Sequence, residues 1–138
     1  MKIKSIYTGM IVVLALLLSG ISSEIVQGQS PPVEHELVVK KINDVWRVVH
    51  ADDELKSDVT VRRGDRIRWT VEGSNASFQF SDDRLFGGGT RTIRDGNPLV
   101  LAVRGGAEFG IYTYSVFLHE DQQFAVGNSP PRIFVIAH

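Results

Sequence analysis

Apolar and polar side chains alternate with a period of two along most of this chain, and this alternation limits the fold more than any other feature. In residues 66–71 (RIRWTV), arginine and threonine alternate with isoleucine, tryptophan and valine. In residues 112–118 (YTYSVFL), two tyrosines, a valine and a leucine form one apolar face. A period of two is typical of half-buried β-strands, and no segment carries a convincing helical stripe. The sequence therefore predicts an all-β domain.

The alternating segments are short, and turn-forming residues separate them. Asparagine, aspartate and glycine interrupt the pattern at residues 43–44 (ND) and 64–65 (GD). Residues 90–94 and 99–103 flank the sequence DGN at residues 95–97, which predicts a β-hairpin. Seven or eight short strands at this spacing predict a β-sandwich or a small barrel.

The N-terminus has the three parts of a secretory signal peptide. Lys2 and Lys4 give a positive start, and residues 10–18 (MIVVLALLL) form an apolar run that is short for a membrane span. The preferred cleavage site follows Gly28, with a cut near Ser23 or an uncleaved anchor as alternatives. We therefore expect a secreted or periplasmic protein.

Three parts follow from this assignment. They are a signal peptide at residues 1–28, an extended leader at residues 29–35, and a single domain at residues 36–138. The chain has a net charge of −1, and its first 28 residues carry two lysines and one glutamate, so the remainder has about −2. This balance favours neither nucleic acid nor an anionic membrane as partner. The chain has no cysteine, so packing alone must stabilise the domain without a disulfide.

Parity along the strands predicts which side chains form the core. Trp69 lies between Ile67 and Val71 on one face of its strand, so we expect it to be buried. The arginines of residues 62–68 are interleaved with nearby acids and predict a charged outer face. The predicted aromatic and aliphatic core comprises Trp69, Phe78, Phe80, Tyr112, Tyr114 and either Ile133 or Phe134.

Three segments together resemble the cupredoxins, the small blue-copper proteins related to plastocyanin and azurin. They are residues 59–71 (VTVRRGDRIRWTV), residues 110–119 (GIYTYSVFLH) and residues 131–137 (PRIFVIA). Their order and spacing resemble that family over residues 36–137. The resemblance implies a Greek-key β-sandwich with the copper ligands at one end. An immunoglobulin-like or fibronectin-like sandwich is the alternative.

The resemblance also implies a position for each copper ligand. The two histidine positions fall on Ser77 and His119, the cysteine position falls on Val116, and the weak methionine falls near Phe124. Only His119 is retained. A blue-copper centre needs a thiolate and two imidazoles, and this chain contains no thiolate. We therefore expect no such centre and no cofactor.

The remaining groups of polar residues suggest at most a weak metal site and no catalytic site. His119 precedes Glu120 and Asp121, which could help it hold copper or zinc weakly. Ser115, His119 and Asp121 do not form a plausible nucleophile triad, because Ser115 lies on the opposite face from the inward tyrosines. We therefore expect no enzyme.

The sequence predicts an exported, non-catalytic binding or interaction module on a copper-free cupredoxin-like scaffold. Its partner is an unknown protein or small-molecule ligand in the exported compartment, and the alternative is weak copper or zinc handling. Two arrangements of Phe124 are open: inward into the space of the missing copper site, which is preferred, or outward as an apolar anchor. Asn75 also begins a glycosylation acceptor sequence, NAS. The candidate binding surface comprises Asn75, Ser77, His119, Phe124 and Asn128.

Overall fold

The computed structural model describes residues 31–127 and 130–137. The predicted signal peptide and Asn128 lie outside these residues. Within them, no helix is long and apolar enough to cross a membrane.

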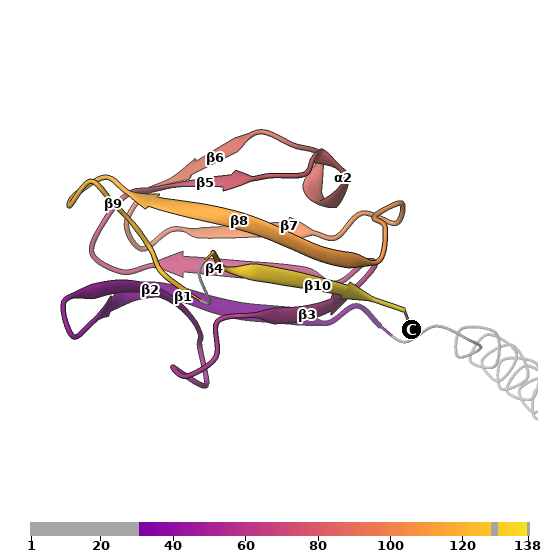
Figure 1. Ribbon diagram of the computed structural model, residues 1–138, viewed down its shortest axis with the longest axis horizontal. Coiled ribbons are helices and arrows are strands. Elements are labelled where there is room, and N and C mark those ends of the chain that lie inside the picture. Colours follow the sequence, from indigo (N-terminus) through magenta and orange to yellow (C-terminus); the bar gives the residue numbers. More distant parts are fainter. Residues whose placement is uncertain (1–30, 128–129, 138) are drawn as a thin grey trace, which may run out of the picture. The chain divides into compact units, whose positions relative to one another are not determined.

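Ten strands and one short helix make up the described part of the chain, with the labels of Figure 1. In chain order they are β1 (Glu34–Ile42), β2 (Val45–His50), β3 (Val59–Arg62), β4 (Arg66–Val71), β5 (Ala76–Phe80), α2 (Asp83–Phe86), β6 (Thr90–Ile93), β7 (Pro98–Ala102), β8 (Gly110–Leu118), β9 (Gln123–Phe124) and β10 (Arg132–Ile136).

The strands form two sheets (Figure 1). One has the order β2-β1-β4-β7, and the other has the order β3-β10-β8-β5-β6, with β9 attached to β8. Most pairs are antiparallel, but β1 with β4 and β3 with β10 are parallel. The prediction of an all-β sandwich is therefore confirmed, with two mixed sheets.

The core lies between the sheets and is centred on Trp69. This residue projects from β4 and is fully buried. Its ring centroid lies 5.6 Å from that of Phe78 on β5 and 5.6 Å from that of Tyr114 on β8. Its indole N–H donates to the Tyr114 hydroxyl at 3.2 Å, so the polar groups of both aromatic side chains are paired inside the core.

The predicted core is confirmed. Parity alone separates Ile133, which is buried, from Phe134, which faces outward and is half-buried. Neighbouring residues of a strand point to opposite faces, so only one of the two can enter the core. The predicted residues that are buried are Trp69, Phe78, Phe80, Tyr112, Tyr114 and Ile133.

The predicted hairpin at residues 90–103 is wrong. β6 pairs with β5 in one sheet, whereas β7 pairs with β4 in the other. The turn itself forms, because Asn97 N–H donates to the Arg94 carbonyl at 3.0 Å. Gly96 N–H, however, donates to the Val71 carbonyl at the end of β4. The turn therefore carries the chain from one sheet to the other.

A short helix appears where the sequence predicts none. Asp82 caps α2 by accepting a hydrogen bond from Arg84 N–H, and Gly87 ends it in a left-handed conformation. Leu85 is the buried residue of this turn. A helix of four residues is too short to show a periodic stripe, which explains why the pattern misses it.

A buried carboxylate fixes the start of the domain. Asp65 accepts hydrogen bonds from the Val33 and Arg62 N–H groups, each at 3.0 Å, and its Oδ2 lies 3.0 Å from His35 Nε2. Burial raises the pKa of Asp65, but these three contacts outweigh it and hold the pKa below its ordinary value. Accordingly, β1 begins at Glu34, inside the segment predicted as an extended leader.

The central position of Trp69 gives a stability prediction. Replacing it in Trp69→Ala should lower the free energy of unfolding by roughly 3–5 kcal/mol, because a large cavity opens between the sheets. Leu55→Ala is the control, since Leu55 is 95% exposed and its loss should change stability by no more than about 0.5 kcal/mol. Urea unfolding followed by circular dichroism measures both, and equal effects would contradict the core assignment.

Candidate functional site

Antiparallel pairing of β5 with β8 brings three of the predicted surface residues together at one end of the sandwich. His119 follows the last residue of β8, and its N–H donates to the Asn75 carbonyl at 2.9 Å. The Ser77 hydroxyl on β5 lies 2.7 Å from His119 Nε2 and 3.1 Å from Thr92 Oγ1 on β6. Residues 42 positions apart thus form one small hydrogen-bonded cluster, as the resemblance predicted by position.

Hydrogen bonds fix the backbone beside this cluster. Buried Ser74 donates its hydroxyl to the Asn75 carbonyl at 2.6 Å and accepts the Glu120 N–H at 3.0 Å. The Asn75 side-chain oxygen accepts the Asp95 N–H at 2.9 Å. The Asn75 side chain is exposed, and its amide oxygen serves this structural bond.

Phe124 points outward, so the preferred inward arrangement is wrong. Its side chain is 63% exposed, and its ring centroid lies 5.1 Å from that of Phe117. β9 pairs with β8 in a register that places Phe124 opposite Phe117, on the outer face of the sheet. Ala125 takes the inward position instead and donates its N–H to the Val116 carbonyl at 2.9 Å.

The residues at the positions implied for copper do not fit a blue-copper centre. Val116, at the cysteine position, is fully buried in the core and offers no donor atom. Ser77 offers a hydroxyl where the second imidazole would be, so His119 is the one nitrogen ligand of the set. Among residues 31–127 and 130–137, no three histidine, cysteine, aspartate or glutamate side chains are grouped so that they could hold a metal ion.

Asp121 belongs to a contact that the sequence did not reveal. Its Oδ2 accepts the Trp46 indole N–H at 2.7 Å and lies 2.5 Å from Lys41 Nζ. The Lys41 hydrogen bond, and then that of Trp46, hold the pKa of Asp121 below its ordinary value. The carboxylate thus fastens the loop after β8 to the β1–β2 hairpin. The inward parity of Trp46 was a usable signal, since a buried indole N–H needs a partner.

No known family model and no curated protein matches this chain. Among solved structures, it is 14% identical to amicyanin from Paracoccus versutus (Thiobacillus versutus), over 80% of this chain and 86% of that one, with a TM-score of 0.46. It is 11% identical to an oxidised variant of amicyanin, over 80% of this chain and 87% of that one, with a TM-score of 0.45. Likenesses of this size say nothing about a site.

The parallel strand pairs bear on the two sandwich types that the sequence left open. Immunoglobulin-like sandwiches are built from antiparallel sheets. Here β1 lies parallel to β4 and β3 lies parallel to β10, and each parallel pair joins strands that are distant along the chain. The fold is a β-sandwich of two mixed sheets, and its parallel pairs set it apart from a purely antiparallel sandwich.

The outward position of Phe124 gives the second prediction. Phe124→Ala should lower the free energy of unfolding by about 1 kcal/mol or less, because the variant loses one surface ring contact and opens no cavity. Phe78→Ala is the matched control, since the same truncation in the core should lower it by roughly 3–5 kcal/mol. Denaturant unfolding compares the two variants, and similar losses would place Phe124 in the core after all.

The Asp121 contact gives the third prediction, a dependence on pH. A carboxyl whose pKa is lower in the folded state stabilises the fold above its unfolded pKa, ordinarily 3.8, and that stability is lost as the pH falls through the folded value. Asp121→Asn should therefore unfold more easily than the wild type at pH 6, and the difference should shrink below about pH 3.8. Thermal melts at both pH values measure it. A difference that persists in acid would contradict a role for the charge.

Proposed function

We propose that this chain is an exported, non-catalytic binding module on a cupredoxin-like scaffold that holds no blue-copper centre. The observation that carries the proposal is Val116, a fully buried side chain without a donor atom at the position implied for the copper thiolate. One of the similar structures is a reduced Cu(I) form of a variant of amicyanin. Electron transfer through such a centre does not extend to a chain without cysteine.

The end of the sandwich around Phe124 supports the binding role. Loops and short edge strands on a rigid β-scaffold are common sites for binding residues. Here exposed Phe124 packs on Phe117 of β8, whose ring centroid lies 5.9 Å from that of His119. On the other side of β8, Phe117 pairs with Ser77 of β5. An apolar anchor with a polar surround is typical of recognition surfaces. The N-terminal signal pattern supports export to the periplasm or the medium, and sequencing of the exported protein should find Gln29 as its first residue.

Weak copper or zinc binding through His119 is the alternative function. In its favour, the His119 side chain is exposed. Against it, His119 Nε2 already contacts Ser77, and the Asp121 carboxylate contacts Lys41 and Trp46. The proposed binding role therefore stands ahead of metal handling.

Copper addition gives the fourth prediction. Cu(II) added to the wild-type protein should give no intense blue absorption, because that band requires a thiolate ligand. Any bound copper should show the electron paramagnetic resonance of an ordinary nitrogen and oxygen site, and His119→Ala should remove it. A strong blue colour in the wild type would contradict the proposal.

Val116 and Ser77 lie on opposite faces of the sheet, because Val116 pairs with buried Phe78 and Ser77 pairs with Phe117. A thiolate at position 116 could therefore not join an imidazole at position 77 on one copper ion. The double variant Ser77→His with Val116→Cys should also give no blue absorption. The proposal that the protein is not an enzyme has its own test. Ser77 Oγ lies 2.7 Å from His119 Nε2, close enough for the imidazole to act as a general base toward the hydroxyl. Hydrolysis of an activated ester that is lost in Ser77→Ala would contradict it.

A further inference from the structure

A groove lies on the outer face of the larger sheet, where β8 changes its neighbour on one side. β8 pairs with β10 through residues 110–113 and with β9 at Phe117 and Leu118. Between these segments, Tyr114 N–H reaches the Pro131 carbonyl at 3.2 Å, and the Val116 carbonyl accepts the Ala125 N–H at 2.9 Å. The sheet therefore opens beside Ser115, between two different partner strands.

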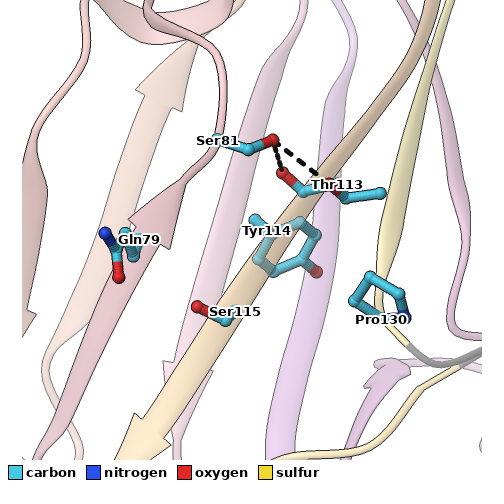
Figure 2. Close-up of a pocket in the computed structure, with 6 residues that line it drawn as sticks. All are labelled: Gln79, Ser81, Thr113, Tyr114, Ser115 and Pro130. Carbon is cyan, nitrogen blue, oxygen red and sulfur yellow. Dashed lines mark hydrogen bonds between the residues drawn. The ribbon is translucent and has the colours of Figure 1, made fainter.

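Two adjoining hollows make up the groove and share Ser115 and Pro130. The first has a volume of about 210 Å³ and is shown in Figure 2, where Gln79 and Pro130 lie on opposite sides of β8. The second has a volume of about 350 Å³ and continues to Phe124. The first hollow is lined by Gln79, Ser81, Thr113, Tyr114, Ser115 and Pro130, and the second is lined by Ser115, Phe124, Ala125, Val126, Pro130 and Pro131.

The lining is neutral, with a polar half and an apolar half. Apart from Tyr114, none of the described residues that line it can ionise at any accessible pH. The Tyr114 hydroxyl is buried against Trp69, and its pKa is raised, chiefly by burial, so it stays protonated. The nearby charge of Arg132, whose β10 position pairs with Thr113, is bound to Asp58 at 2.6 Å. A charged ligand would find no unpaired counter-charge among the described residues that line the groove.

The polar half has two groups available to a ligand. Ser81 and Thr113 hydrogen-bond to each other, with 3.1 Å between their hydroxyls (Figure 2). Gln79 and Ser115 form a cross-strand pair, and none of the hydrogen bonds found among the described residues engages either side chain. An amide and a hydroxyl both donate and accept hydrogen bonds. They therefore suit a ligand whose own polar groups do both, and hydroxyl groups have this property.

We propose that this groove binds a neutral carbohydrate, which deepens the proposed binding function and rests on it. The hydroxyls of a sugar ring hydrogen-bond to Gln79 and Ser115, and the apolar face of a ring packs on Phe124 and Pro130. An extended peptide is a poorer occupant, because strand addition needs free backbone groups. At Ser115, β8 pairs with β5 on one side, and Tyr114 and Val116 use their backbone groups on the other.

Nuclear magnetic resonance titration of the exported protein tests the proposal. The probes are cellohexaose, maltohexaose and chitohexaose, with hexagalacturonic acid as the charged comparison. At least one neutral sugar should shift the Gln79 side-chain amide and the Ser115 backbone amide, with a smaller effect from the acidic sugar. Gln79→Leu and Ser115→Val should each weaken binding about three- to tenfold, as expected for one lost hydrogen bond. Phe124→Ala should weaken it as well.

Thr60→Val is the matched control, because Thr60 is exposed on the outer face of the same sheet, on β3 and outside the groove. It should leave the affinity unchanged. The carbohydrate proposal is overturned if no neutral sugar shifts these signals, if the acidic sugar binds as well as the neutral ones, or if Thr60→Val weakens binding as much as Ser115→Val. The proposed function fails separately, through a blue-copper band in the wild type or through ester hydrolysis that depends on Ser77.

Discussion

The contact of Trp69 with the opposite sheet is the interaction on which the rest of this structure depends. Trp69 comes from the four-stranded sheet, and its ring packs against Phe78 and Tyr114 of the other sheet. Its N–H also bonds to the Tyr114 hydroxyl, so both the distance and the relative position of the sheets are fixed. Without cysteines, the chain has no covalent link to replace this contact. The core contacts of Trp69 therefore also fix where β5 and β8 lie.

The two faces of β8 bear on both the missing copper ligand and the proposed groove. Alternate residues of β8 point inward and outward, so Tyr114 and Val116 fill the core while Ser115 and Phe117 face solvent. The inward side of β8 is thus given to packing, including the position that would need a thiolate. The outward side offers hydroxyl and aromatic groups on a rigid support. The proposed lack of a blue-copper centre and the proposed ligand groove both depend on which side chains β8 carries on its two faces.

The sequence predicted what depends on local parity and missed what depends on distant partners. Period-two alternation was enough to assign Trp69, Tyr112 and Ile133 to the core, because each residue of a strand has only two faces available. It could not show that β6 and β7 belong to different sheets, because a turn sequence has the same residues whichever strands flank it. Family spacing correctly predicted that Ser77 and His119 lie together. It failed for Phe124, whose side depends on the pairing of β9 with β8.

The contacts of Asp65 with Val33 and His35 also determine where a fusion partner or a surface can be joined to the domain. β1 begins beside this carboxylate, level with the start of β4, and β10 ends level with Arg62 at the same end. The cluster of Ser77 and His119 lies beyond the other end of β4, which is six residues or about 20 Å long. A fusion protein, a dye or a sensor surface joined just before Val33 would therefore leave that cluster facing the solution.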